Sequence, residues 1–270
     1  MTLAILTTYY NEVETIDEVV DAIAITPVPF TLYFVDDCSS KPPTNVLKRY
    51  GNEDWFHYMR NSENKGQVFG LNKAIKLAIA NGAEFIAIND ADDISYENRF
   101  TKQLQTFADD PDLMIVGGAA DFTDQETGKL LWQTRHACDN KTIHRHNKIN
   151  STFIHSTVMY RASIFDEVGL YNEDAYANDY DMISRVLASG CKAANLPDVV
   201  LRYNIRDDSM SVSKRRTQVA SRLRVQLKHI KPFDPWSLWG IMRSLIAYIA
   251  PNKAASNIKA AFYCLKNKHS

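Results

Sequence analysis

The sequence predicts an α/β protein with a mostly parallel central sheet flanked by helices. In the first half, strand-like apolar runs alternate with amphipathic stretches of helical spacing. A strand–helix–strand succession of this kind is typical of βαβ units. The chain has 270 residues, 45% of them hydrophobic, which suffices for one large domain with a small appendage.

The elements follow in order along the chain. In the first half we expect strands at 3–6, 31–35, 57–59 and 85–88, and helices at 13–23, 46–50 and 71–79. Pro27 and Pro29 break the first helix, and Asn81-Gly82 closes the last of these helices. In the second half we expect strands at 113–116, 157–160 and 199–203, and a helix at 182–187 ending at Gly190.

Polar clusters follow three of the expected strands. They are Thr8–Glu12, Asp36–Ser40 and Asp90–Asp93. Parallel α/β sheets bind ligands beyond the carboxyl ends of their strands, so these clusters should meet at one rim.

The densest cluster contains Asp90, Asp92 and Asp93. Three carboxylates this close repel one another unless a cation lies among them, and oxygen ligands suit Mn²⁺ or Mg²⁺. The alternative is a solvated acidic loop or a helix cap. The sequence has no glycine-rich phosphate loop, so a bound diphosphate would need a cation to neutralise it.

Other candidates are weaker in isolation. Asp36-Asp37 suits a ribose or base contact, or a turn, and Asp179 suits a general base or a helix N-cap. We interpret His144-Arg145-His146 as a solvated basic loop, and His155 as either structural or part of the site.

Charge is distributed unevenly along the chain. Residues 214–270 carry twelve Lys or Arg and one acidic residue, Asp234; the rest holds 19 basic and 31 acidic residues. An acidic body of −12 over residues 1–213 therefore precedes a basic tail of +11 over residues 214–270. No two of the four cysteines are close enough in sequence to form a metal or redox motif, so we interpret them as reduced thiols. The N-terminal residues have the pattern of a strand rather than of a signal peptide. No apolar run is long enough to span a membrane. A cytoplasmic protein is expected.

The tail predicts basic amphipathic helices. Val219, Leu223, Leu227 and Ile230 recur at helical spacing among cations, and Trp236 and Trp239 follow in an apolar run. This composition suits a helix at an anionic membrane interface, or one that packs on the domain or on a second subunit. Nucleic acid is disfavoured because the aromatic residues do not alternate with the cations.

The order of these motifs resembles family 2 glycosyltransferases with the Rossmann-like GT-A fold. The resemblance covers about residues 2–213 and rests on five short motifs, each weak alone. They are Thr8-Tyr9-Tyr10-Asn11-Glu12, Val35-Asp36-Asp37-Cys38-Ser39-Ser40, Asn64-Lys65-Gly66 leading into Leu71-Asn72-Lys73-Ala74, Asp90-Ala91-Asp92-Asp93, and Asn178-Asp179-Tyr180-Asp181 with Arg185.

The resemblance implies a metal-dependent, inverting hexosyltransferase that uses a nucleotide-diphosphate sugar, with UDP as the nucleotide. It implies an acceptor of the bacterial polysaccharide or lipopolysaccharide type, and a peripheral position on the inner face of the cell membrane. Asp179 would be the catalytic base and Asp92, with Asp90, would hold Mn²⁺ or Mg²⁺. The implied donor-binding residues are Thr8, Tyr10, Glu12, Asp36, Asp37, Asn64, Gly66, Asn72, Asp90 and Asp93.

Two departures from the family pattern stand out. Asn178 replaces a frequent acidic residue before the base, and Asn204 and Arg206 occupy a segment that often carries a histidine. Two alternative functions remain open. One is a haloacid-dehalogenase-like phosphatase, because Asp90-Ala91-Asp92-Asp93-Ile94 resembles that nucleophile motif; the other is a nucleotide-sugar-binding module without activity.

Overall fold

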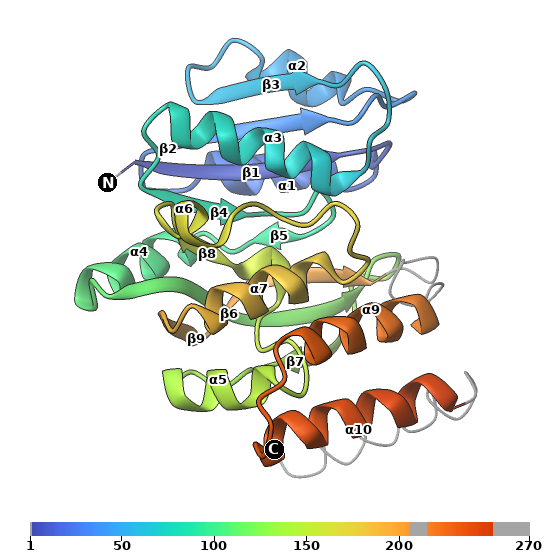
Figure 1. The fold of residues 1–270 in the computed structure, drawn as a ribbon. Helices are drawn as coiled ribbons and strands as arrows, with labels where there is room; N and C mark the ends of the chain where they lie inside the picture. Colours follow the sequence, from blue (N-terminus) through green and yellow to red (C-terminus); the bar gives the residue numbers. More distant parts are fainter. Residues whose placement is uncertain (1, 206–214, 251–270) are drawn as a thin grey trace.

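The structure, a computed structural model, describes residues 2–205 and 215–250. Within this part of the chain, nine strands form one sheet in the order β3-β2-β1-β4-β8-β6-β9-β5, with β7 paired to β6 (Figure 1). Helices cover both faces of the sheet, as predicted for the α/β class.

The first half is the regular βαβ part. Its elements are β1 (Leu3–Tyr9), α1 (Ile16–Ala24), β2 (Phe30–Asp36), α2 (Thr44–Tyr50), β3 (Phe56–Arg60), α3 (Gln67–Ala80) and β4 (Phe85–Ile88). β1 lies between β2 and β4, and all pairings among β1 to β4 are parallel. The carboxyl ends of β1, β2 and β4 therefore lie at one edge.

The second half is mixed. Its elements are β5 (Ile94–Ser95), α4 (Arg99–Asp109), β6 (Leu113–Asp124), β7 (Leu130–Thr134), α5 (Asn140–Asn147), a 3₁₀ turn (His155–Thr157), β8 (Met159–Arg161), α6 (Ile164–Val168), α7 (Asn178–Ala188) and β9 (Lys192–Ile205). β8 is antiparallel to both β4 and β6, and β6 is parallel to β9. β8 thus joins the two halves of the sheet.

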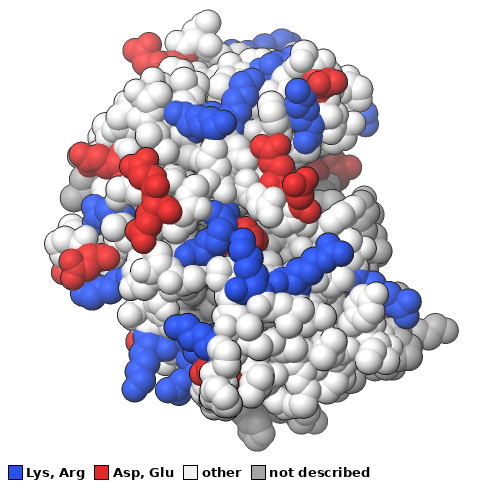
Figure 2. Space-filling model, viewed as in Figure 1, with Lys and Arg blue, Asp and Glu red and all other residues white. Residues whose placement is uncertain are grey.

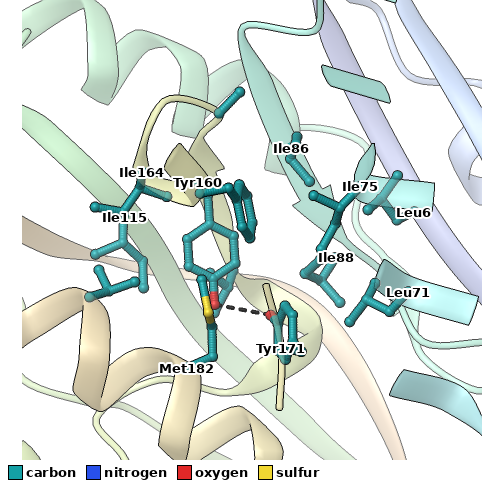
Figure 3. Close-up of a cluster of buried hydrophobic side chains, with 14 of the residues drawn as sticks. Leu6, Leu71, Ile75, Ile86, Ile88, Ile115, Tyr160, Ile164, Tyr171 and Met182 are labelled. Carbon is teal, nitrogen blue, oxygen red and sulfur yellow. Dashed lines mark hydrogen bonds between the residues drawn. The ribbon is translucent and has the colours of Figure 1, made fainter. Parts of the chain in front are cut away.

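Two hydrophobic cores lie on opposite faces of the sheet. One packs α3, α6 and α7 against β1, β4, β6 and β8, and includes Leu71, Ile75, Tyr160 and Met182 (Figure 3). The other packs α1, α2 and α4 against the reverse face. Burial on both faces explains why these strands read as continuous apolar runs rather than alternating ones.

Two helix ends and one predicted loop can be compared directly with the structure. α3 ends at Ala80, and Gly82 has a φ of +80°, which agrees with the predicted Asn81-Gly82 cap. α1 begins at Ile16 rather than at Val13. The interpretation of His144-Arg145-His146 as a loop is wrong: they lie in α5, because Asp139 caps that helix by accepting from the Thr142 N–H at 2.9 Å.

Two helices belong to the predicted tail, α9 (Arg215–Lys228) and α10 (Pro235–Ile249). α9 packs on α7 and α10 packs on α9. The Gln226 amide donates to the carbonyls of Lys148 and Ile149, at 3.2 and 3.1 Å, and so fastens α9 to the body. The predicted boundary between residues 213 and 214, and the tail beyond residue 250, lie outside the described residues.

Candidate functional site

The loops after β1 and β2 are tied together. The Asp37 N–H donates to the Tyr9 carbonyl at 2.9 Å, and the Asn11 side chain accepts from the Lys41 N–H at 2.9 Å. Asn11 has a φ of +58°, a left-handed conformation that Asn adopts more readily than most residues. Of the predicted donor-binding residues here, Thr8 and Glu12 are half-buried and Tyr10 is exposed.

Asp36 is completely buried at the end of β2. One carboxylate oxygen accepts from the Ser39 N–H at 2.8 Å. The other accepts from the Tyr58 hydroxyl at 2.8 Å and from the Arg60 guanidinium, which is partly exposed. The residue predicted to contact the nucleotide base, Asp36, thus forms a cluster with Arg60 and Tyr58, and its carboxylate is hydrogen-bonded to both.

Asp37 organises the following loop. Its carboxylate accepts from the Asn61 amide at 2.8 Å and from the Lys65 and Gly66 N–H groups at 3.0 and 2.7 Å. Gly66 has a φ of +87°, which favours glycine there, and Asn64 lies exposed in this loop. The motif around Asp37 and the motif Asn64-Lys65-Gly66 are therefore joined by hydrogen bonds into one loop structure.

Asn72 is buried on α3. Its amide nitrogen donates to the Tyr171 carbonyl at 2.9 Å, and its oxygen accepts from the Tyr171 N–H at 3.0 Å. Asn72 therefore attaches α3 to the segment between α6 and α7.

The acidic loop after β4 has a different environment. Asp90 accepts from the Gln67 amide at 2.8 Å and from the Ser156 hydroxyl at 2.6 Å, and His155 Nδ1 lies 3.5 Å from it. Burial would raise the pKa of Asp90, but His155, Ser156 and Arg99 outweigh it and lower the pKa below its usual range.

Asp93 is buried behind Asp90. Burial and the charges of Asp92 and Asp90 raise its pKa well above the usual range. The Ser156 hydroxyl lies within hydrogen-bond distance of both Asp90 and Asp93, although it has only one proton to donate. A protonated Asp93 that donates to Ser156, while Ser156 donates to Asp90, satisfies all three groups.

Arg99 supplies a buried positive charge beneath this loop. It is fully buried and donates to the Ile88 carbonyl at 2.7 Å, the Asn89 side chain at 3.0 Å and the Ser95 hydroxyl at 2.9 Å. Burial lowers its pKa to about 9, although the charges of Asp93 and Asp90 act in the opposite direction. The acidic loop is thus anchored through its backbone and neutral neighbours.

The carboxylate set fits a divalent cation that is shared with a diphosphate. Asp92 is half-buried beside Asp90. Within residues 2–205 and 215–250, no group of three or more His, Cys, Asp or Glu side chains forms an all-protein metal site. Mg²⁺ is usually held by one or two carboxylates together with substrate phosphates, and Asp92 with Asp90 supplies that number.

Asp179 lies in the first turn of α7, which starts at Asn178. Its charge raises the pKa of His155, Tyr171 and Tyr203, and the charges of the acidic loop also raise that of Tyr203, so Asp179 lies within electrostatic range of side chains that the loop also affects. Asp181, two residues later, instead pairs with Arg185 at 2.9 Å.

Several residues of this site escaped the sequence interpretation. Gln67, Arg99, Ser156 and Tyr171 have no local signature, because they join the site through pairings distant in sequence. Asn204 donates to the Asp92 carbonyl at 2.6 Å, and its own N–H donates to Asp93 at 3.3 Å. The sequence indicated Asn204 only by its place in a segment where the family often has a histidine. Arg206, in the same segment, lies outside the described residues.

Comparisons with known proteins bear on the family and the fold. The sequence model described as glycosyl transferase family 2 matches residues 4–169. The amylovoran biosynthesis glycosyltransferase AmsE of Erwinia amylovora is 30% identical over 163 residues, which are 60% of this chain and 60% of AmsE. The match thus spans less than two thirds of AmsE. The uncharacterized glycosyltransferase MJ1057 of Methanocaldococcus jannaschii is 25% identical over 222 residues, 80% of this chain and 75% of that protein.

Solved structures share the fold. S. aureus TarS 1–349 in complex with UDP-GlcNAc has a TM-score of 0.70 at 17% identity, over 92% of this chain and 72% of that one. The mannosyltransferase PcManGT of Pyrobaculum calidifontis, in complex with GDP-Man and Mn²⁺, has a TM-score of 0.66 at 18% identity. The match covers 96% of this chain and 74% of PcManGT. These likenesses confirm the predicted GT-A fold.

Proposed function

The chain belongs to glycosyl transferase family 2, and from that premise we propose that it transfers a hexose from a uridine-diphosphate sugar to a hydroxyl of a glycan or lipid-linked acceptor. Transfer inverts the anomeric carbon. The observation that supports this proposal is the position of Asp179 in the first turn of α7, within electrostatic range of Tyr203, which the acidic loop after β4 also affects.

The reaction needs one base and one stabilised leaving group. Asp179 takes the proton of the acceptor hydroxyl while that oxygen attacks the anomeric carbon. The bond from this carbon to the diphosphate oxygen breaks, and its electron pair stays on the diphosphate. Because attack and departure are on opposite faces of the sugar, the configuration inverts.

The loops after β1, β2 and β4 bind the donor. The Asp36–Arg60–Tyr58 cluster meets the base, with Thr8, Tyr10 and Glu12 beside it. Asp37 fixes the loop of Asn64 and Gly66 near the ribose.

At the acidic loop, Asp90 contacts the ribose or sugar, and the buried Asp93 helps to hold Asp90 through Ser156. Asp92, with Asp90, would hold Mn²⁺ or Mg²⁺, and such an ion would supply positive charge that stabilises the leaving diphosphate. Asn72 supports this region through Tyr171.

The two alternatives have no support in the comparisons. Asp90–Asp93 follow β4, whereas the phosphatase nucleophile follows the first strand, and that chemistry leaves Asp36 and Asp37 without a role. A binding module without activity would have no use for a general base, the role proposed for Asp179.

Calorimetric titration of UDP, GDP and dTDP into the full-length protein, with and without Mn²⁺, tests the donor assignment. We expect UDP alone to bind strongly, and only with the metal. Absence of binding by all three nucleotides would overturn the proposal.

We further propose that α10 lies in an anionic membrane surface and brings the enzyme to a lipid-linked acceptor. No helix among the described residues is long and apolar enough to cross a membrane. The orientation of α10 is unusual for a helix in water. Its small residues Ser237, Gly240 and Ser244 are buried, whereas Trp239 and Ile246 are 50% and 60% exposed.

Close packing explains this inverted arrangement. A Cβ atom at Gly240 would lie 2.0 Å from the Lys148 carbonyl oxygen, so α10 approaches the body through its smallest residues. The outward surface over α10 is largely uncharged, and basic side chains border it (Figures 1 and 2). Exposed cations nearby include Arg224, Lys228, Lys231 and Arg243. Apolar side chains flanked by cations fit an anionic lipid surface.

Flotation with vesicles tests this assignment. Full-length protein should float with phosphatidylglycerol-containing vesicles and less with phosphatidylcholine alone, and the variant Trp239→Ser/Ile246→Ser should remain at the bottom. Leu130→Ser is a matched control, because Leu130 is equally exposed on β7. Equal flotation of the two variants would overturn the membrane assignment. It would also be overturned if wild type, but not the Trp239→Ser/Ile246→Ser variant, had twice the mass of one chain, because α10 would then contact a second copy.

A further inference from the structure

His155 lies between the acidic loop and the segment that leads to Asp179. Its Nδ1 is 3.5 Å from an Asp90 carboxylate oxygen, and its Nε2 is 3.2 Å from the Tyr171 hydroxyl. The rings of His155 and Tyr171 also meet edge to face, with centroids 5.6 Å apart and planes at 82°. Both nitrogens of a mostly buried imidazole therefore have partners on different elements.

The hydrogen bonds continue into the core. The Tyr171 hydroxyl lies 3.1 Å from the Tyr160 hydroxyl on β8, within the apolar cluster of Figure 3. A consistent set of donors is available: Tyr160 donates to Tyr171, Tyr171 donates to His155 Nε2, and the Nδ1–H donates to Asp90. Each group then donates once, and no buried proton lacks an acceptor.

Tyr171 is itself fixed by its backbone. Asn72 holds its N–H and its carbonyl from α3. Arg185 on α7 donates to the carbonyls of Val168 and Leu170 in the same segment. These hydrogen bonds attach the segment to α3 and α7, and Asp179 lies at the start of α7.

We propose that His155 is a positioning residue that holds the acidic loop and the Asp179-bearing segment at a fixed separation by bridging Asp90 and Tyr171. The inference rests on the proposed function, because it assigns Asp90 to the donor and metal and Asp179 to the acceptor. Its role is to set the distance between the leaving group and the base. Misplacement of reacting groups by about 1 Å costs on the order of 100-fold in rate, so such a link affects turnover more than binding.

A double-mutant cycle tests the link. His155→Asn keeps an amide nitrogen near the Nδ1 position and loses the Nε2 contact, while Tyr171→Phe removes the other partner. We expect each variant to lower kcat about tenfold and to change the donor KM less than about twofold, as for other outer-shell contacts. The double variant should lose no more than either single variant, because both cut the same contact.

The control is Tyr33→Phe, which changes a buried tyrosine on β2 whose hydroxyl accepts from Asn81, the residue that follows α3. It should leave kcat unchanged. Normal kcat in Tyr171→Phe, or additive losses in the double variant, would overturn the proposal, because His155 would then act independently of Tyr171.

A second measurement does not depend on transfer. In ¹⁵N-histidine-labelled protein, with the His155 signals assigned from His155→Asn, Tyr171→Phe should shift the Nε2 resonance and Tyr33→Phe should not. Unchanged resonances in Tyr171→Phe would exclude the contact. If the contact is present but wild type transfers no sugar, the proposed function fails and the bridge remains.

Discussion

The two carboxylate clusters at the strand ends have similar sequences but different environments. Asp36 and Asp37 after β2 are bonded to a guanidinium, a hydroxyl, an amide and backbone N–H groups. In the acidic loop after β4, Asp90 and Asp93 share one Ser156 hydroxyl, and burial together with the charges of Asp92 and Asp90 raises the pKa of Asp93. The carboxylates of the first cluster are hydrogen-bonded to partners of their own chain, whereas the carboxylates of the second lie close enough together to repel one another.

This difference suggests that the first cluster mainly shapes its loop, whereas the second mainly serves the reaction. A carboxylate whose partners are supplied by its own chain shapes a loop and presents those partners, here Arg60 and Tyr58, to a ligand. Carboxylates that repel one another are stabilised by an added cation. Substitutions in the first cluster should therefore reduce stability, and those in the second should reduce activity.

The largest effect should come from Asp179→Asn. Without a base, kcat should fall about 1,000-fold, within the usual range for loss of general base catalysis. The binding of UDP and the thermal unfolding midpoint should stay close to wild type, since Asp179 lies outside the donor loops. Single-turnover measurement of sugar transfer checks the rate, and calorimetry checks binding. A loss of UDP affinity as large as the loss of rate would contradict the assignment.

The next largest effect should come from Asp92→Asn. Removing one carboxylate from the acidic loop should weaken Mn²⁺-dependent UDP binding about 100-fold, at the upper end for a contact that supports a metal. Binding without metal should be weak in both proteins, and EDTA should reduce wild type to the level of the variant. A variant that still responds fully to Mn²⁺ would place the metal elsewhere.

The sequence predicted the carboxylates but not their environments. Asp36, Asp37, Asp90, Asp92 and Asp93 each follow an apolar strand run, and parallel topology places such strand ends together. Their partners are determined by tertiary packing, which has no local pattern. Ser156 and His155 reach the acidic loop because β8 inserts antiparallel beside β4, a pairing that strand periodicity does not indicate.

Residue type also misled where packing decided the structure. The basic run at residues 144–146 suggested a loop, but Asp139 caps a helix there and Ile143 is buried in the core. In α10, the apolar run suggested a membrane-facing or packed helix. Only the structure shows that the small residues face the body.

A smaller effect, on stability rather than activity, should come from Asp36→Asn. The variant removes a fully buried carboxylate from Tyr58, Arg60 and the Ser39 N–H, and it should lower the free energy of unfolding by about 2 kcal/mol. Because Arg60 is partly exposed, water takes up part of its lost interaction. Urea denaturation measures the change, with the exposed Asp54→Asn as the control. A change below that of the control would remove the distinction between the clusters.

The smallest effect, and one of opposite sign, should come from Asp93→Asn. Burial and the charges of Asp92 and Asp90 raise the pKa of Asp93, so an uncharged amide resembles its favoured protonated form. The free energy of unfolding at pH 7 should stay the same or rise by up to about 1 kcal/mol. A raised pKa in the folded state means that wild type loses stability as the pH rises above the ordinary value of 3.8, so the advantage of the variant should shrink on acidification. Urea denaturation of both proteins at pH 5 and pH 8 measures this trend. A loss as large as that of Asp36→Asn would mean that both clusters stabilise the ligand-free fold equally.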